Sequence, residues 1–249
     1  FRILSAIQEK TALRMVSLSG GSRDNVIPSQ ARADIWVEKA ESAHLAIEEM
    51  VQVLQAEFQT SDPGLSVSVE SVQLDEAYTQ DLTKRLLCFF SLLPNGVQAL
   101  SPDIEGLVQT SLNNAVLFEK EGYLVLQTSL RSSKSSQLEE LADQLKQLAE
   151  SAGGSYLRQN DYPSWDFEVD SPLRDQCLAV YKEVYGREAR YDAVHAGLEC
   201  GFLKKALPEC DMISYGPNIY DVHSTKEHLE IDSVARVWAF TKALLASMR

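Results

Sequence analysis

Hydrophobic residues three or four positions apart recur in several separated stretches of the chain, a spacing that predicts amphipathic helices. The stretches are 42–58, 81–93, 136–149, 173–185 and 231–244. Ser171 and Pro172 stand before the fourth stretch and are residue types that begin helices. On the last helix, the apolar residues that we expect to form its buried face are Ile231, Val234, Val237, Trp238 and Leu244.

Alternation of apolar and polar residues predicts strands between these helices. We expect strands at 31–37, 65–69, 108–118, 123–130 and 155–159. The sequence Leu-Ser-Val-Ser-Val at 65–69 alternates most strictly. Lys120, Glu121 and Gly122 stand between two of the strands and indicate a hairpin turn.

The order helix-strand-strand-helix-strand occurs twice along residues 1–160. We therefore predict an α/β (α+β) fold in which two similar ferredoxin-like lobes, about 1–75 and 76–160, form one domain. Residues 161–249 follow a turn-rich, aromatic stretch and read as a further α/β unit. This unit is too small to be an independent doubly wound domain.

Composition narrows the class of protein. The 249 residues are 45% hydrophobic and carry a net charge of −13, which disfavours nucleic acid as a partner. No apolar run is long enough to span a membrane, no signal peptide is evident, and no paired cysteine spacing suggests disulfides. We expect a cytoplasmic protein. The first residues already show the apolar spacing of a helix, so we also expect that the chain starts inside a longer protein.

The histidines are the first candidates for metal ligands or other functional groups. His195 and Glu199 are four residues apart, which on a helix puts two metal ligands on one face. The alternative is a strand-to-helix turn that requires Gly197 for its backbone. His223 follows an apolar strand and a Gly-Pro turn, where α/β enzymes place functional groups. A lone loop histidine is nevertheless more often structural, and His44 lies in a charged, solvated helix.

Several strings, taken together, resemble one family. The string Asn25-Val26-Ile27-Pro28 is similar to a motif in the family of carnosinases and aminoacylases. Further strings narrow the resemblance to one group within this family: Pro94-Asn95-Gly96-Val97, Gln109 to Asn113, Leu130-Arg131-Ser132, Tyr162-Pro163-x-Trp165, His195 to Gly201, and Gly216-Pro217 with His223-Ser224. In this order and spacing they resemble bacterial aminoacyl-histidine (Xaa-His) dipeptidases. The string His-Ala-Gly-Leu-Glu-Cys-Gly at 195–201 is the most specific.

The resemblance implies a fold and a metal centre. The family's catalytic domain is interrupted by a lid domain, so residues 1–160 would be the lid and 161–249 the end of the catalytic domain. The intact enzyme holds two zinc ions, and His223 matches the histidine that completes the second. The other ligand motifs and the Glu-Glu pair with the general base are absent here, so the site is incomplete and we expect this chain alone to be inactive.

The resemblance also implies residues that contact the substrate. Arg131 would hold the substrate carboxylate, for which a guanidinium fork is suited. Asn25 would approach the substrate, and Asn113 would donate to the developing oxyanion. The alternative for Arg131 is an ordinary surface arginine, and that for Asn25 is a turn residue before Pro28. In related enzymes a lid histidine often has the role given to Asn113, and no histidine lies near it here.

Glu199 and Gly197 fall where the family places a loop that contacts the substrate. Glu199 would pair with the free amine of the dipeptide, and His195 would support the loop. The implied reaction is hydrolysis of an Xaa-His dipeptide by metal-activated water. The implied partners are the dipeptide and, through the lid, a second copy in a homodimer.

One alternative is that the chain is a non-catalytic binding or dimerisation module, or an inactive truncated product. Another is an amidohydrolase with a different substrate.

Overall fold

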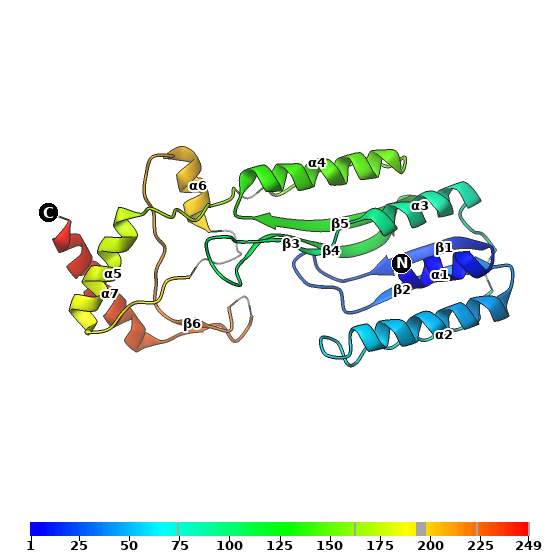
Figure 1. Ribbon diagram of the computed structural model, residues 1–249, viewed down its shortest axis with the longest axis horizontal. Coiled ribbons are helices and arrows are strands. Elements are labelled where there is room, and N and C mark those ends of the chain that lie inside the picture. The colour runs from blue at the N-terminus through cyan, green and yellow to red at the C-terminus, as the bar shows by residue number, and fades with distance from the viewer. Residues whose placement is uncertain (74, 162, 193–197, 223, 249) are drawn as a thin grey trace. The chain divides into compact units, whose positions relative to one another are not determined.

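The protein is described by a computed structural model that covers residues 1–73, 75–161, 163–192, 198–222 and 224–248. The chain divides into two compact units (Figure 1). The first unit comprises residues 1–99, 110–131 and 136–159, and the second comprises 100–109, 132–135 and 160–249. No helix of the described residues has the length and apolar character that a bilayer crossing requires.

The first unit is built on one sheet. Its elements in chain order are α1 (Arg2–Lys10), β1 (Leu13–Gly20), β2 (Ala31–Val37), α2 (Ala40–Glu57), α3 (Gln80–Leu92), β3 (Gly96–Leu100), β4 (Val108–Lys120), β5 (Tyr123–Ser132) and α4 (Ser135–Ser151). The strands form a five-stranded sheet in the order β2-β1-β4-β3, with β5 also paired to β4.

The sheet joins the two halves that the sequence pattern separates. β1 and β2 pair antiparallel from Leu13 opposite Val37 to Gly20 opposite Ala31, with a bulge between Met15 and Ser17. β1 then meets β4 antiparallel at Gly20 opposite Leu117. The mixed α/β class is confirmed. The description as two similar ferredoxin-like lobes is not confirmed: strands of both repeats belong to one sheet.

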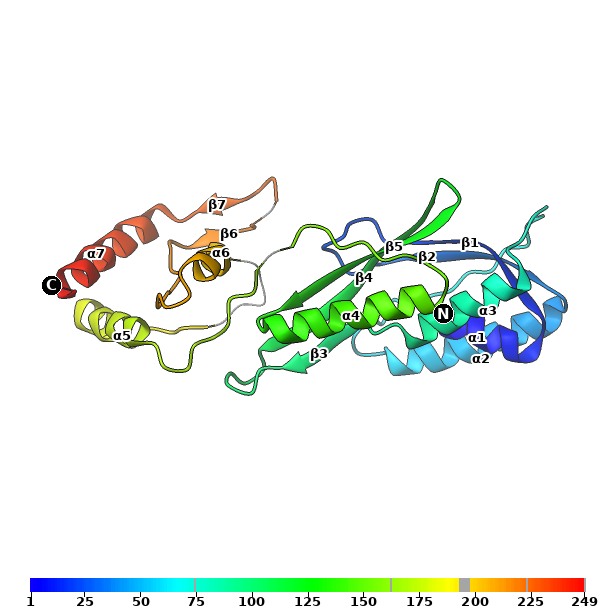
Figure 2. The ribbon, with the colours of Figure 1, turned by 90° about the horizontal axis from the view of Figure 1, so that it is seen from above.

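The helices of this unit lie along one face of the sheet (Figure 2). Residues of α1, α2, α3 and β1 share a core in which Ile7, Leu13 and Met15 are fully buried. A second cluster joins α4 to β4 through Leu112, Leu141 and Leu145. The apolar stripe of each helix is therefore what holds it on the sheet.

Two of the predicted strands are absent. Residues 65–69 and 155–159 belong to neither a strand nor a helix. The alternation of Leu-Ser-Val-Ser-Val predicts an extended segment with one apolar side, but a strand also needs a neighbour to pair with. Val67 and Val69 are instead exposed. The other predicted strands of this unit and its helices are confirmed within a few residues at their ends.

The second unit is built around a pair of helices. Its elements are α5 (Pro172–Tyr185), α6 (Glu199–Ala206), β6 (Ile219–Tyr220), β7 (His228–Leu229) and α7 (Ile231–Ser247). The hydroxyl of Ser171 accepts a hydrogen bond from the Arg174 N–H and caps α5, and left-handed Gly186 ends it. The predicted helix start at Ser171 and Pro172 is confirmed.

α5 and α7 pack together through Cys177, Val180, Phe240 and Leu244. The predicted buried face of α7 is largely wrong. Ile231, Val234 and Trp238 are exposed, and of the residues predicted for that face only Leu244 is buried. The apolar residues of α7 occupy two sides of the helix, and periodicity alone does not tell which side meets α5.

Candidate functional site

Asn25 and Asn113 are brought close together in the first unit. Residues 21–30 connect β1 to β2, and a hydrogen bond from the Gly21 N–H to the Gln30 carbonyl oxygen (3.1 Å) closes this loop. Asn25 lies exposed in a turn of the loop. The side chain of Asn113, on β4, donates from Nδ2 to the carbonyl oxygen of Val26 at 2.9 Å. One N–H of Asn113 thus holds the loop, and its amide has a second N–H to offer.

Gly21 lets this loop approach β4. Its φ is +70°, and a Cβ built on it would lie 1.8 Å from the carbonyl oxygen of Ala115. No residue with a side chain fits there without moving the strand. Gly21 therefore positions the loop. It was not among the predicted site residues, although the pair Gly20-Gly21 is visible in the sequence.

Arg131 lies near the end of β5 and is exposed. Its neighbour Leu130 packs against the cluster beneath α4. Because successive side chains of a strand point to opposite faces, Arg131 leaves the sheet on the face away from α4. Because Arg131 belongs to a strand, its backbone is held in place, which suits a side chain that binds a planar group such as a carboxylate.

Glu199 is the first residue of α6 in the second unit, and it is exposed. Leu198 before it is extended, with φ −124° and ψ 150°, so α6 begins at Glu199. His195, Gly197 and His223 lie outside the described residues, and their roles stay predictions.

Gly201 seats α6 on the chain segment before α5. A Cβ on Gly201 would lie 2.4 Å from the carbonyl oxygen of Pro163. The last glycine of the string at 195–201 therefore has a packing role: it brings the start of α6, and Glu199 with it, directly against residues 163–164.

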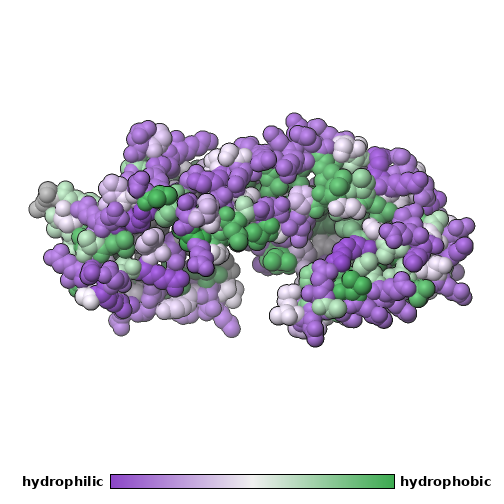
Figure 3. All heavy atoms as spheres, viewed as in Figure 1, coloured by the Kyte–Doolittle hydropathy of each residue, from purple (hydrophilic) through white to green (hydrophobic). Residues whose placement is uncertain are grey.

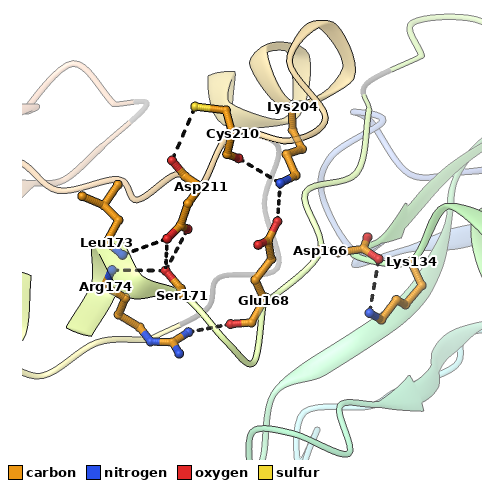
Figure 4. Close-up of polar contacts among 9 residues, drawn as sticks. All are labelled: Lys134, Asp166, Glu168, Ser171, Leu173, Arg174, Lys204, Cys210 and Asp211. Atoms are coloured by element: carbon orange, nitrogen blue, oxygen red, sulfur yellow. Dashed lines mark hydrogen bonds and ion pairs between the residues drawn. The ribbon is translucent and has the colours of Figure 1, made fainter. Parts of the chain in front are cut away.

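A polar network fixes the other end of α6 (Figure 4). Lys204 forms an ion pair with Glu168 and donates to the carbonyl oxygen of Cys210 at 2.8 Å. The hydrogen bond to Glu168 raises the pKa of Lys204. Lys134 forms a second ion pair with Asp166, at 3.2 Å. Both ends of α6 are thus held by the segment 163–168.

Asp211 links this network to the start of α5 (Figure 4). Its carboxylate accepts hydrogen bonds from the Ser171 hydroxyl at 2.8 and 2.9 Å and from the Leu173 N–H at 2.8 Å. Burial alone would raise the pKa of Asp211, but the hydrogen bonds from Leu173 and Ser171 outweigh it and hold the pKa below its usual value. Nothing in the local sequence around Asp211 signals this long-range contact.

The described residues include no group of three or more His, Cys, Asp or Glu side chains placed to hold a metal ion. His228, which is described, stacks on Tyr220 and lies 3.6 Å from Asp221. The described part of the chain therefore does not by itself fit a zinc centre.

Two known proteins resemble this chain over nearly all of its length. It is 31% identical to the cytosol non-specific dipeptidase of Escherichia coli (strain K12), over 98% of the chain and 51% of that protein. The crystal structure of aminoacylhistidine dipeptidase from Vibrio alginolyticus matches it with a TM-score of 0.90 and 30% identity, over 98% of the chain and 50% of that structure. Over nearly its whole length, the chain is similar to one half of an aminoacylhistidine dipeptidase.

This relationship confirms the resemblance that the sequence strings indicate. The chain spans about half the length of the dipeptidases it matches. A search of protein-family models finds no match.

Proposed function

We propose that this chain provides one half of a dipeptidase that hydrolyses Xaa-His dipeptides. The observation that carries the proposal is the match over 98% of the chain, in sequence and in fold, to proteins named as dipeptidases. The name of the Escherichia coli relative also supports a cytoplasmic location. Residues 1–160 would act as the lid, and dimerisation through them stays a prediction that sedimentation would check.

Within this proposal the residues of the first unit recognise the substrate. Arg131 would bind the carboxylate of the dipeptide with both arms of its guanidinium. Asn25 and Asn113 lie together at the 21–30 loop, where the second N–H of Asn113 would donate to the substrate carbonyl.

The residues of the second unit would bind the other end of the substrate and the metal. Glu199, held by the packing of α6, would pair with the free amine, with His195 and Gly197 shaping the preceding loop. His223 would be a zinc ligand. Because zinc needs three or four protein ligands, the remaining ones must come from the half of the enzyme that this chain does not match.

A fused protein tests the function. In it, residues 1–249 replace the matching half of the Escherichia coli dipeptidase. We expect hydrolysis of Ala-His that a chelator abolishes and zinc restores, while the 249-residue chain alone hydrolyses none. A folded, zinc-loaded fusion without dipeptidase activity would contradict the proposal.

Variants of the same fusion test the roles of Arg131 and His223. Arg131→Ala removes a charge-assisted contact of about 1.5 to 3 kcal/mol, so kcat/KM should fall roughly ten- to a hundredfold or more. The loss should vanish on the dipeptide amide and be smaller for Arg131→Lys, which keeps the charge but lacks the fork. An equal loss on the amide would exclude the carboxylate role.

His223→Ala should lower both the zinc content and kcat of the fusion. His44→Ala is the matched control, because His44 lies exposed on α2 of the first unit and should leave both values unchanged. Full zinc content in the His223 variant would exclude the ligand role.

A further inference from the structure

Two exposed apolar side chains lie in the loop that carries Asn25. Val26 is 46% exposed and Ile27 is 81% exposed. Figure 3 shows further hydrophobic side chains at the surface in the part of the view that holds the first unit, so exposure alone does not distinguish these two. What distinguishes them is their position beside Asn113 and Arg131, the residues that contact the substrate in our proposal.

The backbone of this loop is held in place at Val26. The Val26 N–H donates to the carbonyl oxygen of Arg23 at 3.4 Å, and its own carbonyl oxygen accepts from Asn113 Nδ2 at 2.9 Å. A further hydrogen bond, from the Gly21 N–H, closes the base of the loop. Ile27 therefore extends from backbone that is fixed next to it, as a side chain that positions part of a ligand requires.

Asn113 and Arg131 leave the sheet on the same face. Asn113 follows Leu112 and Arg131 follows Leu130, and both leucines pack in the cluster beneath α4. Successive side chains of a strand alternate between faces, so Asn113 and Arg131 both point away from α4. The antiparallel hairpin of β4 and β5 turns at 121–122, which places Arg131 across from the part of β4 that carries Asn113.

This arrangement limits how a dipeptide would lie in the proposed site. With its carboxylate on Arg131 and its scissile carbonyl oxygen on Asn113, the C-terminal residue of the dipeptide would span the gap between the two strands. Paired strands are about 4.8 Å apart, a gap that one residue bridges. The side chain of that residue would then lie beside the loop that Asn113 binds, where Val26 and Ile27 offer apolar surface.

We propose that Ile27, together with Val26, contacts the side chain of the C-terminal residue and so sets the preference among dipeptides. Apolar surface favours a large apolar side chain or a neutral imidazole over glycine, which has no side chain to bury. It disfavours an acidic side chain, which would lose its water there. The preferred substrates are dipeptides with a large apolar or aromatic C-terminal residue, of which Xaa-His is one kind. This inference rests on the proposed function.

The fused protein tests the assignment with two series of substrates. One series varies the C-terminal residue, as Ala-Gly, Ala-Leu and Ala-His, and the other varies the N-terminal residue, as Gly-Ala and Leu-Ala. Ile27→Ala should lower kcat/KM about tenfold for Ala-Leu and Ala-His, which corresponds to the loss of about two buried methylene groups. The values for Ala-Gly and for the second series should change less than about twofold.

Two further variants serve as controls. Ile27→Leu keeps an apolar side chain of the same volume and should keep the preference for Ala-Leu over Ala-Gly. Val53→Ala, at an apolar position of α2 that is 50% exposed, should change neither series. An equal fall for Ala-Gly and Ala-Leu in Ile27→Ala would mean that Ile27 only holds the loop. That result, a fall confined to the second series, or no change at all would overturn the inference.

Binding to the 249-residue chain separates this inference from the proposed function, because the residues that carry it all belong to the first unit. N-Acetylleucine and N-acetylglycine each offer a carboxylate and an amide carbonyl, and NMR titration measures their binding without hydrolysis. N-Acetylleucine should shift the methyl signals of Ile27 and bind about tenfold more tightly, and Ile27→Ala should remove the difference. Equal binding of the two compounds would overturn the inference, whereas a fused protein that hydrolyses no dipeptide would contradict the function alone.

Discussion

At the scale of single residues, two glycines position the groups that the family resemblance selects. Gly21 lets the loop that carries Asn25 lie against β4, and Gly201 lets the start of α6, with Glu199, lie against Pro163. In each case a Cβ would meet a backbone oxygen, which moves less readily than a side chain. The residues that bind substrate in our proposal thus depend on residues that have no side chain.

Gly21→Ala should lower the free energy of unfolding of the first unit by about 2 to 4 kcal/mol. The left-handed φ costs roughly 1 kcal/mol, and the clash with Ala115 adds the cost of overpacking, about 1 to 3 kcal/mol. Gly122→Ala is the matched control: its φ is +80°, but its Cβ would meet nothing within 4 Å. Urea unfolding of both variants measures the difference, and equal losses would show that the close approach is unimportant.

The hydrogen bonds of Asp211 predict that the stability of the second unit falls at acid pH. Its pKa in the folded state lies below the ordinary value of 3.8. The stabilisation it gives is therefore present above that ordinary value and is lost as the pH falls through the folded-state pKa. Asp211→Asn should reduce the free energy of unfolding at pH 7 by about 1 to 2 kcal/mol, because the hydrogen bonds from Ser171 and Leu173 weaken. The variant and the parent should converge as the pH falls below 3.8 and through the folded-state pKa, and a constant difference would contradict this account.

At the scale of elements, α7 shows how a helix can be predicted while its orientation is not. Its apolar residues form two stripes, and only the stripe with Phe240 and Leu244 meets α5. Leu244 is 3% exposed and its neighbour Leu245 is 61% exposed. The two leucines are one residue apart but lie in different environments.

This pair gives a direct test of the packing. Leu244→Ala should destabilise the second unit by about 2 to 5 kcal/mol, because it leaves a cavity between α5 and α7. Leu245→Ala should change stability by less than about 0.5 kcal/mol in this chain, because its side chain already contacts water. Thermal unfolding of both variants followed by circular dichroism is the measurement. Similar losses would mean that both stripes are covered.

At the scale of the whole molecule, each compact unit has its own core. The first core joins three helices to β1, and the second joins α5 to α7. Chains with more than one core commonly unfold in more than one step.

We expect two unfolding transitions in urea, which tryptophan fluorescence can separate. Trp36 on β2 reports the first unit, and Trp165 and Trp238 report the second. Gly21→Ala should move only the transition of Trp36, and Leu244→Ala only that of the other two. A single transition that both substitutions shift equally would show that the units unfold together.

The sequence by itself determined most of the local structure and the resemblance to dipeptidases. Helices such as α2 and α5 follow from apolar spacing and end residues, and the hairpin of β4 and β5 follows from Gly122 between two alternating strands. These signals lie within a few residues of one another, so they can be read without knowing the fold. The strings that indicate a dipeptidase are equally local, and the matches to known dipeptidases confirm this resemblance.

The tertiary structure decided which elements meet. It joins β1 to β4 in one sheet, leaves 65–69 outside any strand, and selects the buried side of α7. It also brings Asn113 to Val26, 87 positions away in sequence, and Asp211 to Ser171, 40 positions away. Pairing and packing depend on contacts between distant parts of the chain, whereas a local pattern defines only the surface that each element offers.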